Sequence, residues 1–420
     1  LMAGMLFPFR GEQLPRPMLM KYARSADRAT RRECYEVLGT TLAAHSEQLD
    51  GIFDRLVHVR DRMARKMGYE NFIELGYCRM ERMCYDVQAV QTFRENIVRD
   101  IVPVVSRLRL ENAKRLGIDT FRLYDNEVFT PGGDPTPCGT EALFAAAQKM
   151  YDGMGNVPGT FFRMMCQNEA FDVDARPNKW GGGYCTEFVK YHQPFILANF
   201  NGTSGDVDVV THEAGHALNA YLIANNRFAL ELGCGGMETA ETHSMSMEFF
   251  AWPYLDGFFP KAGDAQRYRF QHALDALSFL PYGTMVDEFQ HRIYVEPDLT
   301  PAGRNAVWLE LEAKYRPHID QRGIPYLERG TRWQYQMHIY ETPFYYIDYC
   351  LAQTAAFQFL LASQTDYADA FARYLHLSEQ GGEKLWTELL TEAGFRSPFA
   401  PGALAQLAAQ VEPLIRRQNI

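Results

Sequence analysis

Residues 211–221 read THEAGHALNAY, and two histidines in this stretch lie four residues apart. Four residues are about one helical turn, so His212 and His216 are expected to project from the same face of a helix. His-Glu-x-x-His on a helix is a known zinc pattern in which the intervening glutamate, here Glu213, acts as general base. The alternative is a helix that packs two histidines. Because a catalytic zinc takes three protein ligands and one water, a third ligand is expected elsewhere.

The next predicted helix supplies a candidate for that ligand. Residues 237–252 read METAETHSMSMEFFAW, and several side chains share one helical stripe: Glu238, Glu241, Ser244, Met245 and Glu248. Carboxylates among apolar residues are costly to bury unless they are paired or bound to a metal. We therefore predict Glu241 as the third ligand, since a solvated acidic face fits poorly beside so many Met and Phe residues. Glu248 is predicted to accept the second N–H of a ligating histidine, with a structural ion pair as the alternative.

Composition narrows the class of protein. The 420 residues are 47% apolar, which is enough for a large core, and the net charge of −10 argues against a nucleic-acid or anionic-membrane partner. The sequence contains no run of 18 or more apolar residues, so no membrane span is predicted. The eight cysteines form no CxxC pair, so we expect reduced thiols and a cytoplasmic location.

The chain is expected to form two lobes of one unit. Residues 1–120 have a helical pattern, with one helix ending before Gly68 and another opening at Asp86 with a kink at Pro103. Because the first residue is Leu1 and no signal peptide follows, an N-terminal segment could be missing from this lobe. A Gly- and Pro-rich loop at 131–140 separates it from the second lobe, residues 121–420.

The second lobe contains the one persuasive strand region. After expected helices at 141–151 and 161–171, residues 181–203 read GGGYCTEFVKYHQPFILANFNGT, which predicts a β-hairpin or small sheet. A strand edge next to the metal could hold a peptide by main-chain pairing. Gly182 and Gly183 would let its backbone approach closely, so these glycines and Tyr184 are candidate substrate contacts. A flexible loop feeding a purely structural hairpin is an equal alternative.

Taken together and in this order, five motifs resemble the oligoendopeptidase F branch of the thimet oligopeptidase family of zinc peptidases. These motifs are GGGYC, NFNGTSGDVD, THEAGHA, ETHSMSMEFF and HIYETPFYYIDY. The resemblance extends from Lys21 to Phe357. It implies a mainly α-helical fold with a deep substrate channel, a small β-sheet beside the zinc helix, and cleavage of short peptides in the cytoplasm.

The resemblance also implies roles for single residues. It assigns one zinc ion per chain to His212, His216 and Glu241, with Glu213 as the base. Members of the family carry a histidine and closely spaced tyrosines that face the zinc, and the matching positions here are His338, Tyr345, Tyr346 and Tyr349. Donors to the tetrahedral oxyanion are expected among them, with Tyr349 first, then Tyr346 and His338. The alternative is that these aromatic residues, at helical spacing, belong to the core. Tyr345 is expected to pack or to contact the substrate.

The predicted function is therefore a zinc-dependent oligoendopeptidase that cuts internal bonds of short peptides. A dipeptidyl carboxypeptidase or carboxypeptidase is the first alternative, and it would need a basic residue for the substrate's terminal carboxylate. A zinc hydrolase that is not a peptidase would not need the glycine-rich strand. An inactive peptide-binding protein, the alternative from another class, is disfavoured because all four metal-site residues are present.

Overall fold

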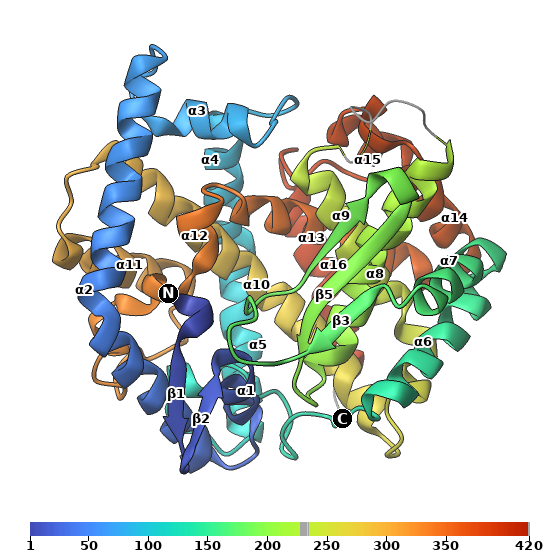
Figure 1. The fold of residues 1–420 in the computed structure, drawn as a ribbon, viewed down its shortest axis with the longest axis horizontal. Coiled ribbons are helices and arrows are strands. Elements are labelled where there is room, and N and C mark those ends of the chain that lie inside the picture. The colour runs from blue at the N-terminus through green and yellow to red at the C-terminus, as the bar shows by residue number, and fades with distance from the viewer. Residues whose placement is uncertain (227–232, 234, 419–420) are drawn as a thin grey trace.

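The computed structural model of the chain describes residues 1–226, 233 and 235–418, and helices dominate that part (Figure 1). The prediction of a mainly α fold is therefore confirmed. The helices are α1 (Arg16–Met20), α2 (Arg28–Lys66), α3 (Phe72–Arg79), α4 (Val87–Asn96), α5 (Val102–Arg115), α6 (Thr140–Met154), α7 (Asn156–Gln167), α8 (Gly205–Asn226), α9 (Met237–Phe250), α10 (Asp264–Val295), α11 (Pro301–Tyr315), α12 (Met337–Glu341), α13 (Tyr346–Ser363), α14 (Tyr367–Glu379), α15 (Trp386–Glu392) and α16 (Ala403–Gln418).

Helix boundaries in the first 120 residues follow local chemistry. α2 ends at Lys66, and Gly68 adopts a φ of 89°, as the predicted glycine stop requires. The carboxylate of Asp86 accepts the backbone N–H of Ala89 at 2.8 Å and caps α4, which confirms the helix start predicted there. Before Pro103, which has no N–H to donate, a π-helical segment, Ile97–Ile101, separates α4 from α5.

In the described residues, five strands form two small sheets. The predicted hairpin is confirmed as β4 (Tyr184–Phe188) and β5 (Gln193–Phe200), which pair antiparallel. β3 (Phe171–Asp174) pairs parallel to the other side of β5, so β4 is an edge strand. β3 was not predicted: the helix expected over 161–171 reaches its first residue, whereas α7 ends at Gln167. The hairpin of β1 (Leu6–Phe9) and β2 (Glu12–Pro15), whose Phe7 and Phe9 are buried, was not predicted either.

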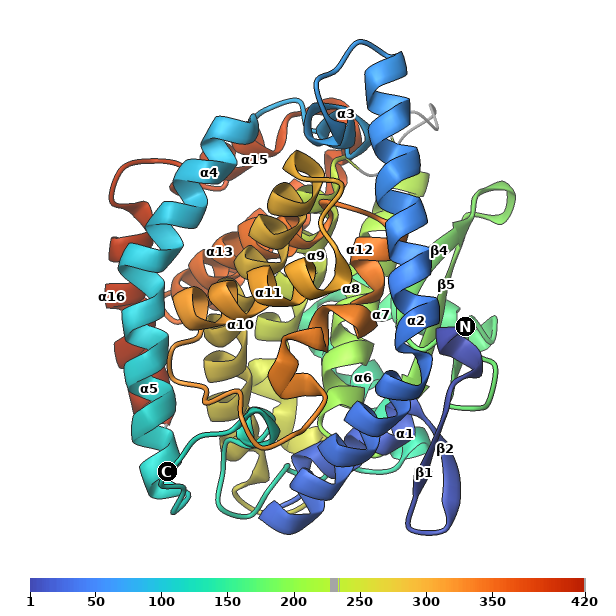
Figure 2. The ribbon, with the colours of Figure 1, turned by 90° about the vertical axis from the view of Figure 1, so that its left-hand side faces the viewer.

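Among the described residues, the larger of two hydrophobic cores extends from Phe53 to Ile415 and joins α8, α9, α10 and α13. A smaller core lies under the β1–β2 hairpin and the first half of α2, which runs along one side of the molecule (Figure 2). The sheet of β3, β5 and β4 lies beside α8 (Figure 1). The division into lobes at residue 120 stays a prediction.

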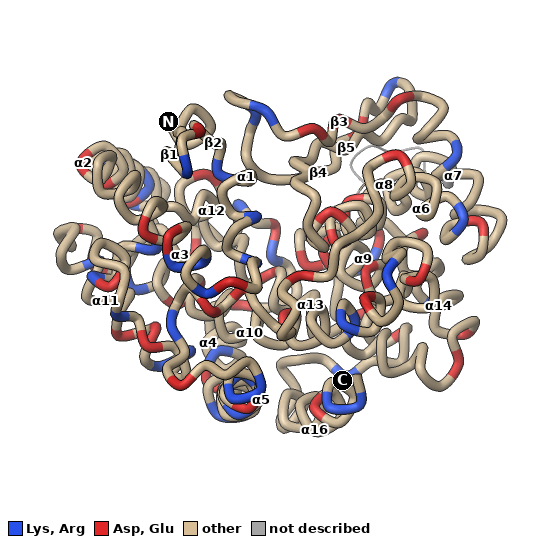
Figure 3. The backbone as a smooth tube through the Cα atoms, turned by 90° about the horizontal axis from the view of Figure 1, so that it is seen from below, with Lys and Arg blue, Asp and Glu red and all other residues tan. Residues whose placement is uncertain are grey.

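Basic and acidic residues both occur throughout the described part of the chain (Figure 3). Lys and Arg are interspersed with Asp and Glu along the backbone (Figure 3). No helix in the described part of the chain combines the length and the apolar character needed to cross a membrane. None of the seven described cysteines is in a disulfide, while Cys234 lies outside the described residues.

Candidate active site and metal centre

α8 and α9 pack closely where the site is built. A Cβ atom added at Gly215 would lie 2.7 Å from the Cα of Ser244 and 2.8 Å from the carbonyl oxygen of His243, both on α9. Only glycine therefore permits this approach of the two backbones. The glycine of the HEAGH stretch brings the helix of the histidines against the helix of Glu241.

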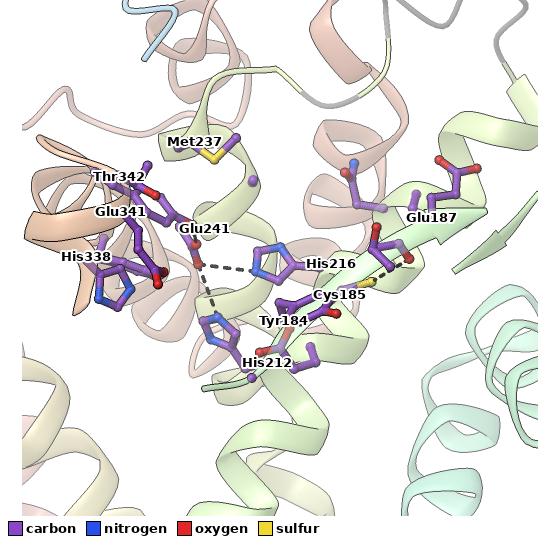
Figure 4. Close-up of a pocket in the computed structure, with 18 of the residues that line it drawn as sticks. Tyr184, Cys185, Glu187, His212, His216, Met237, Glu241, His338, Glu341 and Thr342 are labelled. Carbon is purple, nitrogen blue, oxygen red and sulfur yellow. Dashed lines mark hydrogen bonds and ion pairs between the residues drawn. The ribbon is translucent and has the colours of Figure 1, made fainter. Parts of the chain in front are cut away.

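The contact brings three possible metal ligands together. One ligand atom from each of His212, His216 and Glu241 lies within 4.8 Å of the others. The Oε2 atom of Glu241 is 3.3 Å from Nε2 of His212 and 3.4 Å from Nε2 of His216 (Figure 4). Ligand atoms about 2.1 Å from a tetrahedral zinc are about 3.4 Å apart. Both the two-nitrogen, one-oxygen donor set and its spacing therefore fit zinc.

Glu248 orients the first of these imidazoles. Its Oε1 atom lies 2.6 Å from Nδ1 of His212, a distance for a hydrogen bond between a ring N–H and a carboxylate. A proton on Nδ1 leaves the lone pair of Nε2 directed at the cluster. The structure thus brings Glu248 into contact with one of the two histidines predicted as metal ligands.

Glu241 has partners on both of its oxygens. The Ser244 hydroxyl donates to Oε2 at 2.9 Å from one helical turn along α9, and the Tyr345 hydroxyl donates to Oε1. Two donors fix the rotamer of a carboxylate that is only 1% exposed. Neither partner was predicted, although the i, i+3 spacing of Glu241 and Ser244 was visible in the sequence.

Glu213 lies beside the cluster and is 6% exposed. Its Oε2 atom has no hydrogen-bond partner in the described structure, and burial raises the pKa of the carboxyl. A Cβ atom at Gly183 on the neighbouring loop would come within 2.9 Å of Oε1. Gly183 therefore leaves room for this carboxylate, a steric role that differs from the predicted approach of a substrate backbone.

These side chains open into a cavity of about 420 Å³ between β4, α8, α9 and α12. Glu187 on β4 and Glu341 on α12 lie on opposite walls (Figure 4). The described lining contains no Lys or Arg, and the sequence analysis overlooked much of it: Trp180, Cys185, Thr186, Glu187, Asn219, Ala220, Ile223, Gly233, Met237, Ala240, Met337, Glu341 and Thr342.

His338 and Tyr349 also line the cavity. Burial lowers the pKa of His338 to about 4, so its imidazole is neutral near pH 7. The Gln336 side chain accepts the Tyr282 hydroxyl through Oε1 and donates through Nε2 to Nδ1 of His338, at 3.2 Å. The ring proton of His338 is therefore on Nε2. Burial, followed by the charge of Glu241, raises the pKa of Tyr349 well above 10, so its hydroxyl keeps its proton as a donor.

Two predicted site residues lie outside this cavity. Tyr346 borders a second cavity of about 340 Å³, because the face of α13 that carries it packs on Phe279 and Tyr282 of α10. Its ring also contacts that of His338 at 4.9 Å. Gly182 does not line the site: its carbonyl oxygen accepts the Asn199 amide at 2.8 Å, and a Cβ atom there would overlap the ring of Trp180. The structure therefore corrects both expectations, whereas Gly183, Tyr184 and Tyr345 do line the cavity.

Comparisons with known proteins agree with this geometry. The family model described as peptidase family M3 matches residues 21–131 and 159–409. Oligopeptidase PepF of Bacillus subtilis (strain 168) is 22% identical over 398 residues, which cover 91% of this chain and 56% of PepF. The chain thus spans little more than half the length of that curated relative.

Solved structures match nearly the whole chain. The structure described as PZ peptidase A with inhibitor 2 has a TM-score of 0.96 and 43% identity, covering 99% of this chain and 74% of that one. A putative oligoendopeptidase F from Bacillus anthracis str. Ames has a TM-score of 0.90 and 38% identity, covering 99% of this chain and 72% of that one. The fold described above is therefore shared with these proteins over almost all of its residues.

Proposed function

Because the chain belongs to peptidase family M3, we propose that it is a zinc-dependent oligoendopeptidase that hydrolyses internal bonds of short peptides. The observation that carries the proposal is the spacing of 3.3 and 3.4 Å between Oε2 of Glu241 and the two imidazole Nε2 atoms, beside the buried Glu213. A zinc ion held by His212, His216 and Glu241 would acidify a water molecule and polarise the scissile carbonyl.

The remaining chemistry falls to the side chains around it. Glu213 would accept the proton of the attacking water and deliver it to the leaving amine, since one of its oxygens has no protein partner. The Nε2–H of His338 and the hydroxyl of Tyr349 are the proposed donors to the developing oxyanion. The edge of β4, with Tyr184, would align the peptide by main-chain pairing.

The carboxypeptidase alternative receives less support. Such an enzyme must bind the terminal carboxylate of its substrate with a cation or an equivalent donor set. The described residues that line the cavity include neither Lys nor Arg. We therefore retain internal cleavage as the proposal, while a cytoplasmic location and the absence of nucleic-acid or membrane partners stay predictions.

Metal content tests the assignment of ligands and base. Purified protein should contain about one zinc per chain, and Glu241→Ala should lower zinc affinity strongly because it removes a ligand atom. Glu213→Gln should retain the zinc and lose nearly all turnover, because the amide cannot accept the water proton. Elemental analysis with a peptide cleavage assay measures both. Wild-type zinc affinity in Glu241→Ala, or substantial turnover in Glu213→Gln, would contradict these roles.

A further inference from the structure

A chain of hydrogen bonds continues beyond Glu248, away from the metal cluster. The indole Nε1 of Trp252 lies 2.9 Å from Nδ1 of His272, within a buried contact. Because an indole nitrogen can only donate, Nδ1 of His272 must present its lone pair. The proton of this neutral imidazole is therefore on Nε2.

That proton points at Glu248. The Nε2 atom of His272 lies 2.7 Å from Oε2 of Glu248, while Oε1 of the same carboxylate lies 2.6 Å from Nδ1 of His212. Both oxygens of Glu248 thus accept ring N–H groups from opposite sides. The indole of Trp252 thus fixes the tautomer of His272. The carboxylate of Glu248, which can only accept, fixes that of His212, whose Nε2 lone pair faces the ligand cluster.

Three elements hold the relay in place. Glu248 is on α9, Trp252 is in the 3₁₀ segment Trp252–Gly257, and His272 is on α10. The ring of Tyr268 stacks on His272 at 5.5 Å and 22°, and the ring of Phe249 lies at 4.7 Å. With both nitrogens bonded and its ring packed on aromatic neighbours, His272 has one defined orientation.

The bond between His272 and Glu248 restrains a carboxylate that lies beside a cavity. Glu248 and His272 both border the cavity of about 340 Å³ that also contacts Tyr346. Without the N–H of His272, the carboxylate could rotate toward this polar cavity, and its bond to His212 would lose its fixed geometry. Bonds of this kind behind a metal ligand typically contribute 10- to 100-fold in metal affinity.

We propose that His272 is a positioning residue of the metal centre: oriented by Trp252, it holds Glu248 in the rotamer that fixes the tautomer and direction of His212. The inference rests on the proposed zinc site and extends it by two residues that contact neither metal nor substrate. The proposal specifies the direction of each hydrogen bond, which a role of His272 in packing alone would not require.

Zinc affinity of four variants, measured by competition with a chromophoric chelator, tests this proposal. His272→Leu removes the donor and should weaken zinc binding by about 10- to 100-fold. His272→Gln keeps an N–H donor near the position of Nε2 and should recover most of the loss. Trp252→Phe frees Nδ1, so it should weaken binding less than His272→Leu. The matched control is His318→Leu, which removes another buried histidine from the same cavity and should keep wild-type affinity.

The outcomes separate this proposal from the proposed function. Wild-type affinity in His272→Leu would overturn the positioning role, and so would a loss that His272→Gln does not reduce, because that loss would come from packing. If His272→Leu does not fold, Trp252→Phe decides, since unchanged zinc affinity there would equally overturn the relay. A wild-type protein that binds no zinc would instead contradict the proposed function.

Discussion

Tyr346 and Tyr349 lie one helical turn apart at the start of α13, yet they border different cavities. Tyr349 lines the cavity that holds His212, His216 and Glu241, whereas Tyr346 packs at steep ring angles against Phe279 and Tyr282 of α10. Two tyrosines with the same local sequence context thus differ in their access to a substrate. They form a matched pair for testing the oxyanion donor.

Tyr349→Phe should lower kcat by about 10²–10³, because the loss of one oxyanion donor affects the transition state more than ground-state binding. Tyr346→Phe should leave kcat close to that of the wild type. Steady-state kinetics on zinc-replete protein, with Tm measured for both variants, makes the comparison. Equal kcat values for the two variants would place the donor elsewhere, with His338 the next candidate.

At the scale of single residues, the spacing of side chains along one helix could be read from the sequence, whereas contacts between helices could not. The i, i+4 spacing of His212 and His216, and the apolar stripe around Glu241, pointed to a cluster that the structure brings together. The orientation of Tyr346 could not be predicted, because it depends on which face of α13 packs against α10 and α9. His272 was missed because a histidine far along the chain has no local signal until the fold brings it to Glu248.

At the scale of elements, the contact between α8 and α9 is the feature on which the site depends. Gly215 is the point of closest approach, and any side chain there would collide with the backbone of α9. A substitution must push the two helices apart, and it would displace His216 and Glu241 relative to each other. Stability and metal affinity are therefore expected to change together.

Gly215→Ala should destabilise the protein by about 1–3 kcal/mol, the usual cost of overpacking. The control is Gly51→Ala in the middle of α2, where the nearest atom to the added Cβ is a flexible Arg55 side chain at 3.5 Å. That change should stabilise the helix by about 0.4–1 kcal/mol. Denaturant unfolding of both variants gives the comparison. An unchanged or increased stability of Gly215→Ala would show that the helices tolerate a wider separation.

Elements whose ends are marked in the sequence by a capping residue or a glycine stop were predicted well. Elements that depend on a pairing partner far along the chain were not. The Asp86 cap and the Gly68 stop marked helix ends in the sequence itself. α7 instead ends without Gly or Pro, because Glu169 takes the left-handed φ of 50° there. Without such a stop residue, the apolar pattern of the helix continues in the sequence into residues that form β3. β3 also exists only through its parallel pairing with β5, more than twenty residues away.

At the scale of the whole molecule, buried carboxyl groups make stability depend on pH. Burial raises the pKa of Asp206 to about 6, of Glu238 to about 7 and of Asp348 to about 6. Between the ordinary pKa of about 4 and these values, the folded state binds more protons than the unfolded state. The contribution of these three carboxyls to the unfolding free energy therefore falls as pH rises through this range. The buried His338 and His243, whose pKa values are lowered to about 4 and about 3, contribute with the opposite sign.

Removing one of these carboxyls should therefore raise the Tm of the zinc-free protein relative to the wild type increasingly as pH rises from about 4.5 to 7. Carboxyls with a lowered pKa, such as Asp125, lose their contribution only below about pH 4, outside this window. Glu238→Gln removes one ionisable group, so its Tm minus that of the wild type should increase over this window, whereas the difference for Glu70→Gln at an exposed site should not. Thermal unfolding at several pH values measures this. A difference for Glu238→Gln that stays constant or shrinks toward pH 7 would contradict the prediction.

The most direct test of the central claim is cleavage of a defined mixture of short peptides, including peptides with blocked C-termini, read by mass spectrometry with and without a chelator. The account predicts cuts at internal bonds of blocked and free peptides alike, loss of all cuts when zinc is removed, and recovery when zinc is returned. Glu213→Gln serves as the inactive control that still binds the metal. Peptides left intact by a protein with one zinc per chain, or trimmed only from free C-termini, would contradict it.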